Sequence, residues 1–221
     1  MHAEELPAYV SVKPTHVGLS IRAELAFELY SELARELSQL GLFLRVEMED
    51  HTTTEATLKV FARLRAEHDN VGVVLQSRLL RTPADIAALP PVRVSVRMVK
   101  GIYLEPEEIA HTEPEPIREA FLACTRALWE RGDYVSLATH DEGLAQRLFA
   151  LADELGKTTD DYEMQVLLGV QEPLWQAWKA AGRPVRVYVP YGPEWRAYSQ
   201  RRLRKNPQIF RHVLRDVLRL S

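Results

Sequence analysis

Seven short runs rich in β-branched residues alternate apolar with polar side chains, and a helical pattern follows each run. In residues 92–98, for example, valines occupy one parity, and the other parity holds Arg93, Ser95 and Arg97. Because successive side chains of a strand point to opposite faces, such runs predict a sheet with one apolar and one polar face. The runs lie at 9–13, 42–48, around 72, 92–98, around 134, 162–166 and 185–189.

Strand and helix patterns alternate along the whole chain, which predicts parallel β-α units. The helical patterns cover 23–40, 54–68, 83–89, 116–129, 142–155, 172–181, 193–204 and 207–218. Helices would cover the apolar face. The polar face would then line the inside and mouth of a barrel that holds a ligand. We therefore expect an α/β fold of the (β/α)8 TIM-barrel type rather than an open, doubly wound sheet.

The strand count departs from that of a complete barrel, which has eight strands and about 250 residues. Seven strands are visible, and the pattern that would make the first one is missing. We therefore expect one catalytic β/α-barrel domain over 1–221, distorted and N-terminally incomplete. The chain is either truncated at its N-terminus, or it forms a partial barrel that a partner closes or that stays open.

Composition excludes some classes of function. The net charge of −3 gives no argument for nucleic-acid binding, and the lone cysteine, Cys124, rules out a disulfide within the chain. The sequence contains no apolar run of membrane-spanning length and no signal peptide at its start. We expect a soluble, cytoplasmic protein, with peripheral docking on the inner membrane as the alternative.

Polar residues gather where the predicted strands end, and this is where β/α barrels carry their active sites. Cations outnumber carboxylates on the polar parity, so an anionic ligand is expected. We interpret Arg45, Arg93 and Arg186 as a structural network, because they precede the strand ends. Arg97 and Lys100 are interpreted as functional. The strand-end residues are Lys13, Glu47, Gln76, Arg97, Lys100, Thr139, His140, Gln165 and Tyr188.

Two further features are less specific. Arg201 and Arg202 form a cationic pair, and guanidinium groups grip carboxylates with two parallel hydrogen bonds. Neighbours on a helix diverge by about 100°, so one of the two is expected to point inward. His140 is a candidate general base, metal ligand or hydrogen-bond donor. No histidine spacing favours a metal, and the chain has no phosphate loop or dinucleotide fingerprint.

Taken together, the strand ends resemble proline dehydrogenase, from about residue 8 to the C-terminus. Each fragment is short, but all of them occur in the family's order. The matching segments are 12–13, 45–50, 74–77, 97–103, 138–141, 162–165, 186–192 and 201–203. Family members are FAD enzymes with a distorted β/α barrel, preceded by extra helices and a first strand.

The resemblance implies oxidation of L-proline to 1-pyrroline-5-carboxylate, with hydride transfer to flavin N5 and electrons passing to a membrane quinone. It implies catalytic roles for Glu47 and Arg97, with Arg97 near N5. Substrate binding would fall to Lys13, Leu167, Tyr188, Arg201 and Arg202. FAD would be held by Met48, Gln76, Arg97, Lys100, Gly101, Ile102, Thr139, His140 and Gln165.

Three positions depart from the family pattern. Glu47 stands where the family has aspartate, Lys205 stands where a glutamate is usual, and Arg78 replaces an aromatic or small residue. The added positive charge motivates a hypothesis of weaker proline binding or of a more acidic substrate.

Two other functions compete with proline oxidation. The chain is either an enzyme or a non-catalytic or altered-specificity relative that binds a ligand or a partner. A Schiff-base aldolase using Lys100 is a third candidate, but it explains neither Gln76 nor the arginine pair. The sequence does not determine the oligomeric state.

Overall fold

The computed structural model describes residues 8–192. The chain divides into two compact units, Met1–Ser136 and Leu137–Ser221. The expectation of one catalytic domain over the whole chain stays a prediction.

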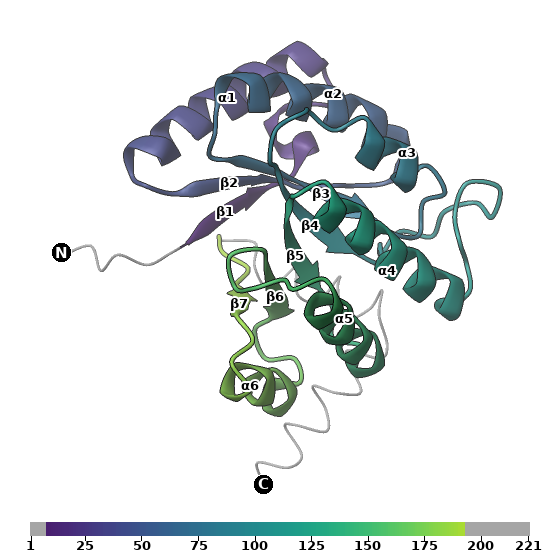
Figure 1. The fold of residues 1–221 in the computed structure, drawn as a ribbon. Coiled ribbons are helices and arrows are strands. Elements are labelled where there is room, and N and C mark those ends of the chain that lie inside the picture. The colour runs from purple at the N-terminus through teal and green to yellow at the C-terminus, as the bar shows by residue number, and fades with distance from the viewer. Residues whose placement is uncertain (1–7, 193–221) are drawn as a thin grey trace, which may run out of the picture. The chain divides into compact units, whose positions relative to one another are not determined.

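The first unit is built on four parallel strands that pair in chain order (Figure 1). They are β1 (Tyr9–Val12), β2 (Phe43–Val46), β3 (Val71–Gln76) and β4 (Ser95–Val99). Ser11 pairs with Arg45 and Arg45 with Gly72. These residues share one face of the sheet, because paired residues of neighbouring strands point the same way.

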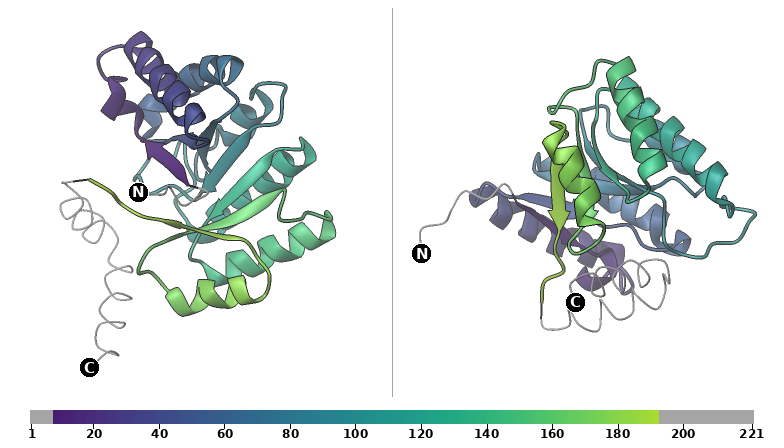
Figure 2. Two further views of the ribbon diagram at one scale, coloured as in Figure 1. Left: turned by 90° about the vertical axis from the view of Figure 1, so that its left-hand side faces the viewer. Right: turned by 90° about the horizontal axis from the view of Figure 1, so that it is seen from below.

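Helices cover the other face of these strands. Figures 1 and 2 show α1 and α2 side by side, and α1 also packs on β2 while α2 packs on β3. The elements are η1 (Pro14–Val17, a short 3-10 helix), α1 (Ala23–Gln39), α2 (His51–Glu67), α3 (Thr82–Ala87) and α4 (Pro114–Glu130). Asp50 caps α2 by accepting a hydrogen bond from the Thr52 amide at 3.1 Å.

The second unit repeats the same strand and helix order. It contains α5 (Glu142–Glu154), β6 (Tyr162–Leu167), α6 (Glu172–Ala180) and β7 (Val185–Tyr188). Strands β6 and β7 are parallel, with Met164 opposite Val185. Inside this unit Phe149 meets Trp178 edge to face at 5.8 Å between ring centroids, which ties α5 to α6.

Strand β5 (Tyr134–Ala138) crosses the division between the units. Within residues 8–192, seven parallel strands therefore succeed one another in chain order, each followed or preceded by a helix. This arrangement confirms the α/β class expected from the alternating runs. The helices expected at 193–204 and 207–218 lie outside the described residues.

Within residues 8–192, the bounds given for the expected helices and strands hold within three residues, and the shift reaches three at the starts of α2 and β4. The short helix η1 was not expected. The alternating pattern starts at Val92, but β4 starts at Ser95. Val92 and Arg93 are exposed, since they directly follow Pro90 and Pro91, which have no amide hydrogen for sheet pairing. The interpretation of Arg93 as part of a buried network is therefore wrong.

Candidate active site

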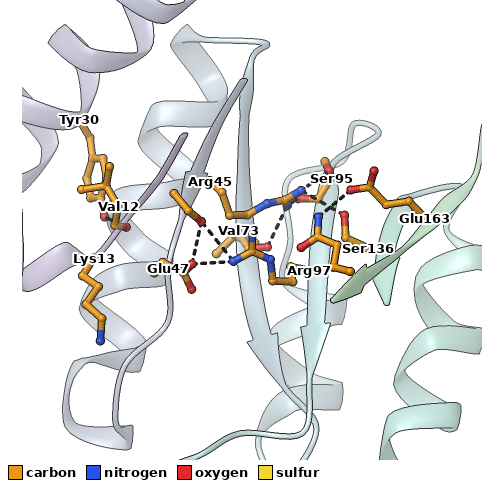
Figure 3. Close-up of polar contacts among 12 residues, drawn as sticks. Val12, Lys13, Tyr30, Arg45, Glu47, Val73, Ser95, Arg97, Ser136 and Glu163 are labelled. Atoms are coloured by element: carbon orange, nitrogen blue, oxygen red, sulfur yellow. Dashed lines mark hydrogen bonds and ion pairs between the residues drawn. The ribbon is translucent and has the colours of Figure 1, made fainter. Parts of the chain in front are cut away.

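The first unit carries a buried ion pair at the carboxyl ends of its strands. Arg97 on β4 donates from Nη1 to Glu47 Oε1 at 2.6 Å, and Ser11 Oγ donates to the same oxygen at 2.7 Å. Figure 3 shows Glu47 and Arg97 pointing toward each other. The Arg97 side chain is only 9% exposed. Glu47 directly follows β2, and its Oε1 accepts from both Ser11 and Arg97. Its negative charge fixes the guanidinium in one place.

Lys13 stands at the end of β1, close to another carboxylate. Its Nζ lies 3.7 Å from Glu49 Oε1 and 3.4 Å from the Tyr103 hydroxyl. Burial acts to lower the pKa of Lys13, but Tyr103 and Glu49 together outweigh it, so the pKa is raised above its ordinary value. Lys13 is therefore a positively charged group in the neutral pH range.

Glu49 links the Lys13 region with Gln76. Its carboxylate accepts hydrogen bonds from the Thr15 amide and hydroxyl, each at 3.0 Å, and its carbonyl accepts one from Gln76 Nε2 at 2.8 Å. We did not single out Glu49 from the sequence. Its parity was a usable signal, because Glu49 lies two residues after Glu47 and so was expected on the same side.

Gln76 and Gly101 lie against each other at the ends of β3 and β4. Gly101 has φ of +95°, and a Cβ added there would lie 2.9 Å from Gln76 Oε1. Only glycine fits this conformation and this space without strain. Met48 is buried, Lys100 is half-buried and Ile102 is exposed.

Below this edge, Arg45 forms the structural network expected for it (Figure 3). It is completely buried, and Nη1 donates to the carbonyls of Ser95 at 2.6 Å and Val73 at 3.2 Å. Nη2 donates to Ser95 Oγ at 2.9 Å. Gly72 leaves the room that the guanidinium fills. The interpretation of Arg45 as structural is confirmed by these contacts.

The second unit holds the remaining described candidates. His140 Nε2 accepts a hydrogen bond from the Leu167 amide at 3.0 Å, which leaves the ring proton on Nδ1. Of the three roles considered for His140, this geometry favours a neutral hydrogen-bond donor. Thr139 is buried beside it, and its hydroxyl accepts from the Asp141 amide at 3.0 Å.

Gln165 belongs to a second buried polar group in this unit. It donates to Glu163 Oε1 at 2.6 Å, and Arg186 Nε donates to Glu163 Oε2 at 2.8 Å. The structural interpretation of Arg186 is confirmed by this pair. Leu167 and Tyr188 pair across β6 and β7 and are half-buried.

Three residues discussed from the sequence as part of the substrate site cannot be located in the structure. Arg201, Arg202 and Lys205 lie outside the described residues. In the part of the chain between 8 and 192, no helix is long and apolar enough to cross a membrane. Those same residues contain no group of three or more histidine, cysteine or acidic side chains that could hold a metal ion.

Parallel β-α units with charged and amide side chains at the carboxyl ends of the strands define the class of β/α-barrel proteins. Comparison with known proteins narrows the class. A family model described as proline dehydrogenase matches residues 2–212. The chain belongs to the proline dehydrogenase family.

Two curated relatives illustrate the similarity. Proline dehydrogenase of Deinococcus radiodurans is 36% identical over 226 residues, covering 99% of this chain and 72% of that protein. Proline dehydrogenase 2 of Bacillus subtilis is 33% identical over 204 residues, covering 92% of this chain and 67% of that protein.

Solved structures support the fold. Proline utilization A from Bdellovibrio bacteriovorus, inactivated by N-propargylglycine, matches with a TM-score of 0.79 and 23% identity over 88% of this chain. The protein described here spans only 24% of that much longer chain. At this identity the match bears on the fold alone, and it confirms the expected β/α-barrel type.

Proposed function

We propose that this chain catalyses FAD-dependent oxidation of L-proline to 1-pyrroline-5-carboxylate. The observation that carries the proposal is the family match over residues 2–212. The strand-end residues of the first unit support it, because a cation fixed by Glu47 lies at the edge where barrel enzymes bind ligands. In the reaction, a hydride leaves C5 of proline, the nitrogen loses a proton, and a C=N bond forms.

The residues of the first unit fit FAD. Gln76 Nε2 donates to the Glu49 carbonyl and its Oε1 lies beside Gly101, and we propose that this oxygen accepts a hydrogen bond from FAD. Gly101 lets the backbone of the Lys100–Ile102 segment approach a flat ring closely. Met48 is proposed to contact FAD together with these residues. In the second unit, Thr139, His140 and Gln165 are proposed to hold FAD.

FAD, when bound, would accept the hydride at N5. Arg97 would hold a fixed positive charge near this point and stabilise the negative charge that develops there. Glu47 and Ser11 hold the guanidinium in place, so no reorganisation is needed during the reaction. Arg97 and Glu47 are therefore the proposed catalytic pair.

Lys13 is the described cation proposed to bind the carboxylate of proline. Its pKa is raised, so it is protonated at neutral pH, where proline carries a carboxylate. Arg201 and Arg202 are proposed to share this task, and Leu167 and Tyr188 to contact the substrate ring. Electrons are proposed to pass on to a quinone, with the protein at the cytoplasmic surface of the inner membrane.

Reconstitution with FAD tests the proposal. Protein that has bound FAD should lose absorbance near ~450 nm when L-proline is added without oxygen, because the oxidised flavin band disappears on reduction. Lys13→Met should raise the KM for proline more than it lowers kcat. The matched control is Lys59→Met, which removes an exposed lysine on α2.

Each outcome has a distinct meaning. Bound FAD without proline-dependent bleaching would overturn the enzymatic proposal in favour of a ligand-binding relative. Bleaching by a more acidic amino acid in preference to proline would support altered specificity, as the departures at Glu47 and Lys205 suggest. Equal KM values for the Lys13→Met and Lys59→Met proteins would remove Lys13 from the substrate site.

A further inference from the structure

Arg78, which follows β3, joins both ends of the loop that begins after β4. Its amide donates to the Lys100 carbonyl at 3.1 Å, and its carbonyl accepts from the His111 amide at 2.7 Å. Its guanidinium reaches further and donates from Nη1 to the Tyr103 carbonyl. One residue thus holds positions 100, 103 and 111 of the loop.

The Arg78 side chain also forms a wall beside Gly101. A Cβ added at Gly101 would lie 3.0 Å from Arg78 Cγ and 3.1 Å from Arg78 Cδ. The Gly101 backbone, with φ of +95°, is therefore enclosed by the aliphatic part of Arg78 on one side and by Gln76 on another. The conformation of this turn depends on both neighbours.

Stability alone does not account for an arginine at this position. Its Nε is buried and has no hydrogen-bond partner within residues 8–192, and an unsatisfied buried donor is destabilising. An apolar side chain of similar length would fill the space beside Gly101 without that cost. It would lack the donor to the Tyr103 carbonyl, which, in the part of the chain that the structure describes, is the interaction that requires the guanidinium.

We propose that Arg78 is a positioning residue that fixes the backbone of residues 100–103 in the conformation that binds the flavin. This inference rests on the proposed function, since it assumes that the Lys100–Ile102 segment contacts FAD. Arg78 acts through that segment and not by touching the substrate. It also gives the departure from the family pattern at this position a role in cofactor binding rather than in substrate charge.

The test compares FAD affinity among four proteins: wild type, Arg78→Met, Arg78→Lys and Arg63→Met. Methionine keeps the aliphatic wall but removes the donor, so FAD should bind about tenfold more weakly, as expected for the loss of a charged hydrogen bond. Lysine keeps a donor and should recover most of the affinity. Arg63 pairs with Glu24 at the exposed surface, and its replacement should leave FAD affinity unchanged.

Two measurements separate positioning from general loss of structure. The visible circular dichroism of bound flavin should change in the Arg78→Met protein and return in Arg78→Lys, because it reports the environment of the ring. Melting temperatures of the FAD-free proteins should agree within a few degrees. FAD affinity and dichroism of Arg78→Met equal to wild type would overturn the inference. Failure of the wild type to bind FAD would overturn the proposed function instead.

Discussion

Gly72 has no room for a larger side chain, because atoms of neighbouring strands surround it. A Cβ at this position would lie 2.5 Å from Arg45 Nη1 and 2.5 Å from the Ser95 carbonyl oxygen. Both are fixed, because the arginine is completely buried and the oxygen belongs to the backbone. Gly72→Ala should therefore lower the free energy of unfolding by about 3 kcal/mol, as expected for overpacking at a buried polar network.

Gly143 provides the matched control for Gly72. It lies in α5, and the nearest atom to an added Cβ is 3.6 Å away. Gly143→Ala should leave stability unchanged or raise it by up to ~1 kcal/mol, since alanine favours helix. Urea denaturation of both variants measures the difference. Equal stability of the two variants would show that the Arg45 network tolerates displacement.

Glu47 combines a structural and a proposed catalytic role. Glu47→Gln would leave the buried Arg97 guanidinium without its carboxylate, and we expect a loss of about 2 kcal/mol in the free energy of unfolding. This value is below the range of about 3–5 kcal/mol for fully buried pairs, because the Glu47 side chain is 19% exposed. Glu55→Gln breaks an exposed pair with Lys59 and should cost less than ~0.5 kcal/mol. Similar losses in both variants would contradict the assigned importance of the Glu47–Arg97 pair.

The burial of the Cys124 thiol can be tested through its pH dependence. Burial raises the pKa of the Cys124 thiol from 9.0 to about 11. Unfolding therefore releases a proton between these values, and stability contributed by the neutral thiol is lost as pH rises from about 9 to about 11. At pH ~8, alkylation by iodoacetamide should be about a hundredfold slower in the native protein than in urea. Comparable rates would show that Cys124 is reached in the native state.

Glu105 joins the loop after β4 to the start of α2. Its side chain is only 2% exposed; its carboxylate accepts from the His51 amide at 3.0 Å and pairs with His51 Nδ1. A carboxylate is favourable at a helix N-terminus, where amide groups lack partners within the helix. The loop that carries Gly101 and Tyr103 is therefore held by Glu105 as well as by Arg78.

Glu105→Gln should loosen this loop. We expect a loss of about 1–2 kcal/mol in stability, typical of a helix cap, and faster proteolysis within residues 100–113. Glu107→Gln changes an exposed glutamate in the same loop and should alter neither quantity. Limited proteolysis with mass spectrometry locates the cut sites. Unchanged cleavage of the Glu105→Gln protein would show that other contacts are sufficient to hold the loop.

At the scale of the whole molecule, periodicity predicted the described strands and helices because it follows from local chain geometry. The polar residues at the strand ends predicted a shared edge of the sheet for Lys13, Glu47, Gln76 and Arg97, because parallel strands end on the same side. Such patterns do not predict which side chains meet across large sequence separations. Glu105 contacts His51 across 54 positions of sequence, and the role of Gly72 depends on an arginine of another strand. These features depend on side-chain partners that lie far apart in sequence.

The two compact units provide the last prediction, which concerns cooperativity. Strand β5 spans Tyr134–Ala138 and so contributes residues to both units, Ser136 to one and Leu137 to the other. Unfolding either unit would remove part of a strand from its neighbour. We therefore expect a single urea transition, as for one domain. A Trp129→Phe protein would shift the fluorescence signal toward the second unit, and a Trp175→Phe/Trp178→Phe/Trp195→Phe protein would shift it toward the first. Coincident midpoints in the two proteins, after correction for the stability that each substitution removes, are the expected result. Separated midpoints would show that the units unfold independently and that the chain comprises two domains.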